Sequence, residues 1–342
     1  MLQSLRPWLT RLRSRWRSDD YDARLSAEIA TFEGQVNVHD LPPMFHYWSN
    51  RYLRPLFEAF GYSHPEDFFA REIAKARALR DRPIRVVSLG AGNGDSELRI
   101  AAMLRERGVN GVRIECLDIN PTMLARCEAD ASAQGLADVV LPLRGDFNTW
   151  RERADVVMAN QSLHHVVELE HLFDAIYDGI GDEGVFLTCD MIGRNGHQRW
   201  PEALAAVHEI WATLPERYRY NLQLQRLERE FLDWDCSVAG FEGIRAQDIL
   251  PLLMQRFGFE TFIAWGNIID VFVDRSFGHH FNPDDESDRA RIDAIHARDE
   301  RGIDIGEWQP THLTAVMRRH TASTRQHKHW SPSFCCRDPQ RH

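Results

Sequence analysis

The chain carries three glycines at alternating positions, Gly90, Gly92 and Gly94, directly after a short apolar run and before an amphipathic helical pattern. Glycine permits a tight turn and a close approach of a ligand to the main chain. A helix that begins there offers unpaired N–H groups and the positive end of its dipole. The spacing is G-x-G-x-G, and Asp95 stands where a dinucleotide fingerprint has its third glycine. The loop therefore favours a ligand with a nucleoside and an amino-acid end over a pyrophosphate.

Polar side chains follow the apolar runs further along the chain. Asp118 ends the next run, where an acid accepts hydrogen bonds from ribose hydroxyls. Asp146 and Phe147 end the third, where they can accept from an adenine amino group and cover its ring. Asn160 ends the fourth and leads to two adjacent histidines, and Asp190 ends the fifth. These positions can together bind a nucleoside and move a proton.

The elements that must position these residues are five apolar strands that alternate with helical patterns. This alternation predicts an α/β fold with a doubly wound, mostly parallel sheet. Ligands of such sheets bind outside the carboxyl ends of the strands, where all of the residues above fall. The expected strands are residues 84–89, 112–118, 139–147, 154–160 and 184–190.

With these motifs in order over about residues 84–192, the chain resembles the class I S-adenosylmethionine-dependent methyltransferases. The resemblance implies a Rossmann-like, seven-stranded sheet, with residues 259–264 as strand six and 311–317 as a reversed last strand. It implies S-adenosyl-L-methionine as the cofactor. Ser88 departs from the family, which often has an acid two residues before the first glycine. The cofactor-binding candidates by this resemblance are Gly90, Ala91, Gly92, Gly94, Asp118, Ile119, Asp146, Phe147 and Asn160.

The candidates for catalysis are His165, His164 and Asp190, which end strands four and five near the expected position of the methyl group. An amine or hydroxyl acceptor must lose a proton, and a histidine or carboxylate can take it. Two other interpretations stay open. His164 can simply cap the following helix, and methyl transfer can proceed by positioning alone, without a dedicated base.

Composition places limits on the class of protein. The formal net charge is −10, which argues against a nucleic-acid partner. The six cysteines form no C-x-x-C pair, so we expect neither a disulfide framework nor a metal site. We see no membrane-spanning run or signal peptide, and we expect a cytoplasmic enzyme. The oligomeric state stays open.

Four segments lie outside the expected sheet or interrupt it. Residues 1–35 begin with a basic amphipathic pattern, and residues 1–18 can contact a membrane surface, an acidic partner or the body of the protein. Residues 36–83 are expected to form a helical cover with His46 and Trp48 toward the substrate. Within the methyltransferase domain, residues 84–318, the insertion 194–256 is expected to cap the site with Tyr218 and Tyr220. The tail, residues 319–342, is expected to be disordered.

The sequence thus predicts methyl transfer from S-adenosylmethionine to an oxygen or nitrogen of a small-molecule acceptor. The alternatives are a non-catalytic cofactor-binding or scaffold protein of the same fold, and carbon methylation or aminopropyl transfer.

Overall fold

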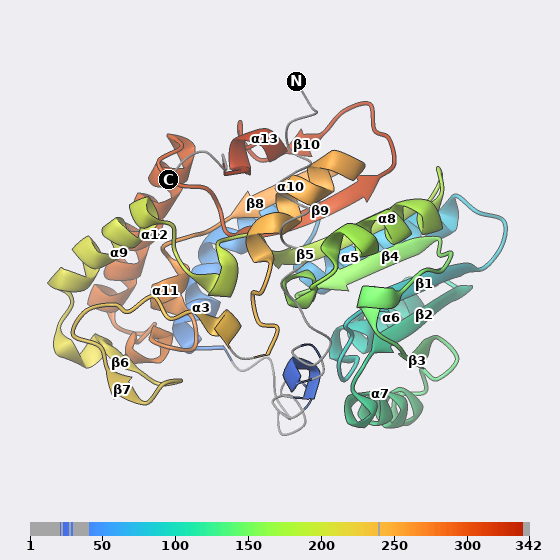
Figure 1. Ribbon diagram of the computed structural model, residues 1–342, viewed down its shortest axis with the longest axis horizontal. Helices are drawn as coiled ribbons and strands as arrows, with labels where there is room; N and C mark the ends of the chain where they lie inside the picture. The colour runs from blue at the N-terminus through green and yellow to red at the C-terminus, as the bar shows by residue number, and fades with distance from the viewer. Residues whose placement is uncertain (1–20, 22, 27–28, 30–40, 239, 338–342) are drawn as a thin grey trace.

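The computed structural model describes residues 21, 23–26, 29, 41–238 and 240–337. Their centre is an eight-stranded sheet of order β10-β8-β9-β5-β4-β1-β2-β3 (Figure 1). Strand β9 runs antiparallel to β5 and β8, and the other neighbours are parallel. The predicted doubly wound sheet with a reversed last strand is confirmed, with β10 added at one edge. The strands are β1 (Ile84–Leu89), β2 (Val112–Asp118), β3 (Val140–Arg144), β4 (Val156–Asn160), β5 (Val185–Met191), β8 (Gly258–Trp265), β9 (His312–Arg318) and β10 (Arg325–Gln326).

The pattern of apolar residues explains this order of strands. Strands β4 and β5 are buried on both faces, as continuous apolar runs in a parallel sheet require. Strand β3 lies at the edge, which accommodates Pro142 because an edge strand can leave one N–H position unpaired. The carboxyl ends of β1, β2, β3, β4 and β5 therefore meet along one edge of the sheet.

Helices cover both faces of the sheet. Helix α5 packs beside α6, and α8 packs beside α10. Figure 1 shows α8 and α10 in front of the sheet and α5 behind it. The helices are α3 (Pro43–Trp48), α4 (Arg54–Ala59), α5 (Pro65–Ala78), α6 (Asp95–Glu106), α7 (Pro121–Ala133), α8 (Leu169–Ile180), α9 (Pro201–Thr213), α10 (Ala246–Arg256), α11 (Asp270–Val273), α12 (Glu286–Asp304) and α13 (Pro332–Cys335). Short 3-10 or π turns are η1 (Ser49–Leu53), η2 (Phe147–Thr149), η3 (Leu163–His165), η4 (Asn195–His197), η5 (Glu216–Tyr218), η6 (Cys236–Val238) and η7 (Gly278–His280).

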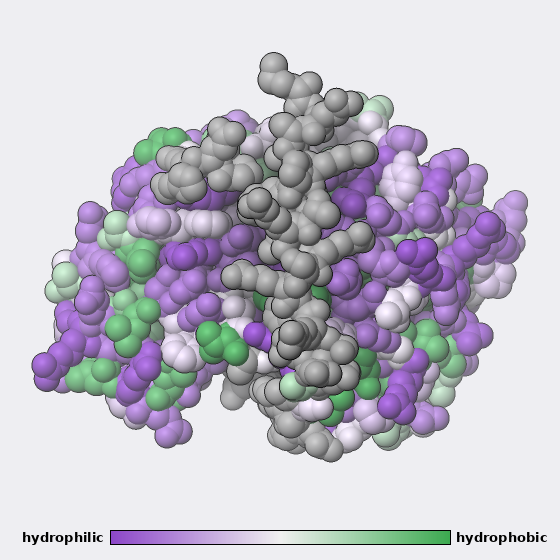
Figure 2. Space-filling model, viewed as in Figure 1, coloured by the Kyte–Doolittle hydropathy of each residue, from purple (hydrophilic) through white to green (hydrophobic). Residues whose placement is uncertain are grey.

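The insertion after β5 divides into two parts with different positions. Its last helix, α10, packs on α8 as a normal cover of the sheet. Helix α9 and the hairpin of β6 (Tyr220–Asn221) and β7 (Arg226–Leu227) lie beside α11 and α12, on the opposite side of the molecule from β1, β2 and β3 (Figure 1). Figure 2 shows apolar groups among hydrophilic ones near this hairpin at the lower left. The exposed apolar side chains of this stretch are Tyr220, Leu222, Leu224, Leu227, Leu232 and Trp234.

The structure corrects the expectation of a disordered tail as far as residue 337. Strand β10 pairs with β8, and α13 follows it. The Trp330 side chain is fully buried, and its Nε1 donates to Asp304 at 2.8 Å. Cys335 is also buried. The polar composition of the tail suggested disorder, but these two buried side chains pack the segment against the rest of the protein.

Most of the basic N-terminal segment, residues 1–20, lies outside the described residues. Tyr21 and Arg24 are described, and Arg24 donates to the carbonyl oxygens of Ser237 and Gly240 at 3.0 and 2.8 Å. None of the helices in the described ranges has the length and apolar character needed to cross a membrane.

Candidate active site

The glycine loop between β1 and α6 forms the floor of the site. Gly90, Gly92 and Gly94 all have φ between 56° and 75°, a region that favours glycine. A Cβ on Gly90 would lie 2.8 Å from Cβ of Ser162, and one on Gly94 would collide with Sγ of Cys127. The first glycine therefore keeps space beside β4, and the third keeps α6 packed against α7.

Asp118 ties the end of β2 to this loop. Its Oδ2 accepts a hydrogen bond from the Gly92 N–H at 2.9 Å, and its Oδ1 accepts from the Asn120 N–H at 2.8 Å. Burial raises the pKa of Asp118, although these backbone donors oppose the shift. The carboxylate thus holds the loop and still borders the space above it.

A cavity of about 220 Å³ opens above the loop at the carboxyl edge of the sheet. It is enclosed by the ends of β1, β2, β3 and β4, together with Tyr21, Ile29 and Phe241 from outside the sheet. Most of the residues predicted to bind the cofactor line it, and so does His165. Gly94 does not line it, nor do His164 and Asp190. The predicted residues in the lining are Gly90, Ala91, Gly92, Asp118, Ile119, Asp146, Phe147, Asn160 and His165.

Three side chains of the lining carry a buried polar atom without a hydrogen-bond partner among the described residues. These atoms are Oδ1 of Asn93, Nδ2 of Asn120 and Oγ of Ser162. Buried polar groups in folded proteins are almost always paired. Side chains with unpaired polar atoms occur in other parts of the described structure as well, so these three atoms do not by themselves identify a ligand.

A contact between distant parts of the chain closes the cavity beside Asp146. Oδ2 of Asp146 accepts a hydrogen bond of 2.7 Å from the Tyr21 hydroxyl, and Oδ1 accepts from the Asn148 N–H at 2.8 Å. The Tyr21 ring packs against Phe241 with 5.4 Å between centroids. Residues from the N-terminal segment and from the insertion thus meet over the cavity.

An acid that sequence reasoning missed lines the opposite part of the cavity. Glu97, on the first turn of α6, accepts a hydrogen bond of 2.6 Å from Oγ of Ser88. Glu97 is 2% exposed, and this burial raises its pKa to about 7, while the Ser88 hydroxyl acts in the opposite direction. The structure therefore supplies an acid beside position 88 from a different element.

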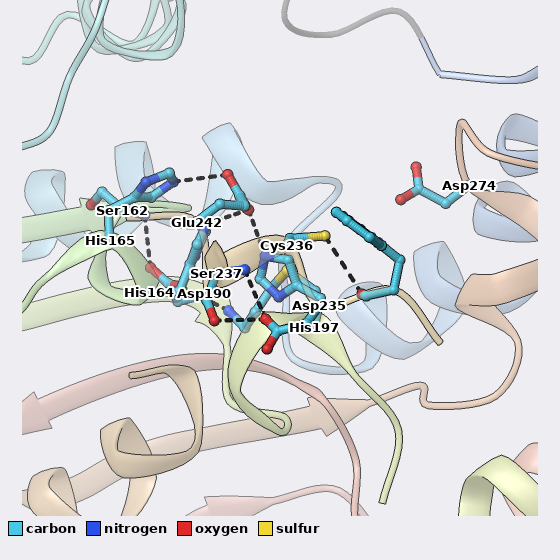
Figure 3. A network of polar contacts seen from close by, with 12 residues as sticks. Ser162, His164, His165, Asp190, His197, Asp235, Cys236, Ser237, Glu242 and Asp274 are labelled. Atoms are coloured by element: carbon cyan, nitrogen blue, oxygen red, sulfur yellow. Dashed lines mark hydrogen bonds and ion pairs between the residues drawn. The ribbon is translucent and has the colours of Figure 1, made fainter. Parts of the chain in front are cut away.

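A cluster of three imidazoles and two carboxylates borders the cavity at the ends of β4 and β5 (Figure 3). Asp190 is fully buried and accepts from Nδ1 of His164 at 2.6 Å. It also accepts from the N–H groups of Ser162 and Leu163 at 2.8 and 2.7 Å. Asp190 thus fixes the turn η3 and the ring of His164, and it does not reach the cavity.

Glu242, from the loop after η6, joins the three imidazoles. Its Oε1 lies 3.4 Å from Nε2 of His164 and 2.5 Å from Nε2 of His197, and its Oε2 lies 3.4 Å from Nε2 of His165. Burial alone lowers the pKa of His164, but Asp190 and Glu242 outweigh it and raise the pKa to about 10. Burial lowers the pKa of His197 despite Glu242. Burial raises the pKa of Glu242, but the imidazoles outweigh it and hold the pKa far below its usual range.

None of the four residues predicted as substrate walls lines this cavity. Trp48 is buried and donates to Nδ1 of His296, while His46 is exposed on α3. Tyr218 is buried, stacks on Phe281 and donates to Asp288. Tyr220 is 38% exposed on the hairpin. Trp48 and Tyr218 therefore pack in the core and do not face the cavity.

The residues that the prediction missed come from segments with weak sequence signals. Glu97 belongs to an amphipathic helix, where an acid usually faces solvent. His197 and Glu242 lie in the insertion, which has no regular period, and Tyr21 is far from every motif. One signal was present for His197: a glycine precedes it in a run rich in polar residues, as in a turn.

The chain is similar to known methyltransferases in two comparisons. A family model described as a methyltransferase domain matches residues 63–264. Among solved structures, a geranyl diphosphate C-methyltransferase from Streptomyces coelicolor A3(2) is 10% identical, with 87% of this chain and 98% of that chain covered and a TM-score of 0.46. An S-adenosylmethionine-dependent methyltransferase from Mesorhizobium loti is 17% identical, with 72% and 96% covered and a TM-score of 0.37. No curated protein sequence matches the chain significantly.

Proposed function

Because the chain belongs to the methyltransferase-domain family, we propose that this S-adenosylmethionine-dependent enzyme methylates an oxygen or nitrogen of a small-molecule acceptor. The observation that carries the proposal is the cavity itself. The glycine loop, Asp118 and Asp146 line one part of it, and an imidazole–carboxylate cluster borders its other part.

We assign the cofactor's groups to the lining by their chemistry. Asp118 accepts from the ribose hydroxyls, and Asp146 with Phe147 holds the adenine. Asn160 lines the space beside the glycine loop, where Glu97 is assigned to pair with the ammonium group of the methionine end, with Asp95 as a second acid in the lining. When bound, S-adenosylmethionine supplies a methyl group made electrophilic by its sulfonium.

We assign activation of the acceptor to the cluster that His165 presents to the cavity. An acceptor atom must be held in line with the methyl group, at roughly 3–3.5 Å. His165 lines the cavity with Glu242 behind it, so it can receive or direct the proton of a hydroxyl or amine. His164 and Asp190 are positioning residues in this proposal, because they hold η3 and do not line the cavity.

Tyr21 and Phe241, which pack together over the cavity beside Asp146, are proposed to cover its nucleoside end. The acceptor is proposed to lie on the side of the cavity that His165 lines.

A transfer assay tests the proposal. Cofactor carrying a labelled methyl group is incubated with a panel of small hydroxyl and amine compounds, and His165→Ala is compared with His279→Ala, which changes an exposed histidine outside the site. We expect His165→Ala to lower kcat by roughly 10²–10⁴-fold while S-adenosylhomocysteine affinity stays within about threefold. Equal kcat in the two variants would refute the role of His165.

A further inference from the structure

The cluster of His164, His165, His197 and Glu242 has the composition of a transition-metal site. Three imidazole nitrogens and one carboxylate oxygen are ligands that Zn²⁺ and its neighbours in the first transition row prefer. Mg²⁺ and Ca²⁺ prefer sites made of oxygen alone. The sequence predicted no metal site, because the ligands come from three separate turns and form no spaced motif.

The ligand atoms converge from those three turns. All three histidines present Nε2 toward the carboxylate of Glu242, and the candidate atoms of His164, His165 and Glu242 lie within 4.8 Å of one another (Figure 3). Ligands about 2.0–2.1 Å from a tetrahedral zinc ion lie about 3.3–3.4 Å apart. The two separations of 3.4 Å have this value, but they start from different oxygens of Glu242, Oε1 toward His164 and Oε2 toward His165, so the carboxylate would have to rotate to bind the ion through one oxygen. His197 does not belong to this mutually close set, although its Nε2 lies 2.5 Å from Oε1 of Glu242, so its ring would have to move toward the other two imidazoles to become the fourth ligand.

The surroundings of the cluster also match those of a metal site. Metal-binding histidines commonly donate their second ring N–H to a carboxylate, which fixes the tautomer. Nδ1 of His164 has this relation to buried Asp190, so its Nε2 is directed at the cluster. Asp190 and Glu242 raise the pKa of His164, so binding of the ion would displace a proton from this ring. Two carboxylates and three neutral imidazoles would then balance the charge of one divalent ion. The Glu242 side chain is 39% exposed, which leaves a route of entry.

The backbone conformation of His197 is also unusual. Its φ is 55°, a left-handed conformation that side chains other than those of glycine, asparagine and aspartate seldom adopt. Such conformations persist where the surroundings enforce them and concentrate at functional sites. Here the conformation brings the His197 ring edge-to-face with His164, with 5.1 Å between centroids.

We propose that His164, His165, His197 and Glu242 bind one divalent transition-metal ion, of which Zn²⁺ is the representative, beside the methyl-transfer end of the cavity. This inference rests on the proposed function and specifies it: with Nε2 of His165 bound to the ion, the ion would take over from that imidazole, hold an acceptor oxygen there and favour its deprotonated form. Metal binding itself requires neither cofactor nor acceptor, so it can be tested separately.

The first test measures zinc in the full-length chain prepared without a histidine tag and stripped by a chelator. Zn²⁺ is titrated against a chromogenic chelator, and bound metal is counted by mass spectrometry. We expect one ion per chain, with affinity reduced at least tenfold in His197→Ala and in Glu242→Ala and unchanged in His279→Ala. Mg²⁺ in excess should not displace it. Equal zinc affinity in all four proteins, or none in the wild type, would overturn the proposal.

The second test needs no variant and so covers the case in which a substitution prevents folding. Co²⁺ added to the stripped wild-type protein should give the visible absorption of four-coordinate cobalt with nitrogen and oxygen ligands. A spectrum identical to that of aqueous cobalt would overturn the site. S-adenosylhomocysteine affinity, measured with and without zinc, separates the two proposals: its loss in both conditions contradicts the cofactor site, whereas its persistence without zinc binding contradicts the metal site alone.

Discussion

The hydroxyl of Ser88 donates a 2.6 Å hydrogen bond to the carboxylate of Glu97, which joins the end of β1 to the first turn of α6 at the wall of the cavity. The carboxylate of Glu97 thus stands beside position 88, where the resemblance to methyltransferases leads us to expect an acid. If Glu97 pairs with the cofactor as proposed, the binding of that cofactor depends on pH.

From the raised pKa of Glu97, we predict that S-adenosylhomocysteine binds more tightly as pH rises from 6 to 8. Burial raises the pKa of Glu97 to about 7, so at pH 6 only about one-tenth of the free protein carries the carboxylate that the ligand's ammonium requires. We expect affinity up to about tenfold weaker at pH 6 than at pH 8. Calorimetry at both values checks this, with Glu97→Gln as the reference.

Titration of the ligand affects binding to the wild type and to Glu97→Gln equally. The difference in pH dependence between the two proteins therefore reports on Glu97 alone. A pH dependence in Glu97→Gln equal to that of the wild type would contradict the assignment. The stability of the free protein gives an independent control. Since the folded pKa is raised, this group's contribution is fully present below its unfolded pKa and is lost as pH rises through about 7, on the order of 3 kcal/mol. Glu97→Gln should remove that loss.

Gly94 predicts a packing defect without a direct effect on the ligand. Alanine at Gly94 would collide with Cys127, in addition to the cost of its φ of 75°. Gly108→Ala is the matched control, because Gly108 has a φ of 70° and nothing within 4 Å of an added Cβ. We expect Gly94→Ala to lose about 1–3 kcal/mol more unfolding free energy than Gly108→Ala. If urea denaturation shows that both variants lose the same unfolding free energy, α6 and α7 can shift to accommodate the added methyl group, which contradicts the prediction.

Tyr21 predicts that the N-terminal segment contributes to cofactor affinity. Tyr21→Phe keeps the ring against Phe241 but removes the donor to Asp146. A hydrogen bond to a charged group contributes roughly 1.5–3 kcal/mol, part of which water can replace, so we expect S-adenosylhomocysteine affinity to fall about 3- to 10-fold. Tyr220→Phe, on the distant hairpin, should leave affinity unchanged. Equal affinities for both variants would remove Tyr21 from the site.

The tail predicts a measurable contribution to stability. Trp330 is fully buried, and its truncation to alanine should cost about 3–5 kcal/mol of unfolding free energy. Trp234→Ala provides the contrast, because that side chain is 49% exposed and its loss should change stability by less than about 0.5 kcal/mol. Thermal denaturation in which Trp330→Ala behaves like Trp234→Ala would show that the tail adds nothing to the fold.

The sheet and the cofactor side of the cavity were predictable because their signals are local. Strands six and seven were expected at 259–264 and 311–317, and β8 and β9 differ from these ranges by one residue at each end. The glycine loop and Asp118 stand at strand ends, where the order of the sheet alone brings them together. The cover of the cavity and the imidazole–carboxylate cluster were not predictable, because Tyr21 meets Phe241, and His197 meets Glu242, only through the tertiary packing of loops. Tyr218 is a different case. It packs against Phe281 in the core, and nothing in the sequence distinguishes such a core aromatic residue from one that lines a site.

The most direct test of the account is a calorimetric titration of S-adenosylhomocysteine into the wild-type chain, Asp118→Ala and Asp138→Ala, the last a change to an acid whose side chain is 73% exposed. Asp118 both borders the cavity and accepts from the Gly92 N–H, so its loss removes a ligand contact and loosens the glycine loop. We predict binding by the wild type and by Asp138→Ala with equal affinity, and a loss of about 1–3 kcal/mol of binding free energy in Asp118→Ala. Absence of binding by the wild type, or unchanged affinity in Asp118→Ala, would contradict the placement of the cofactor in this cavity.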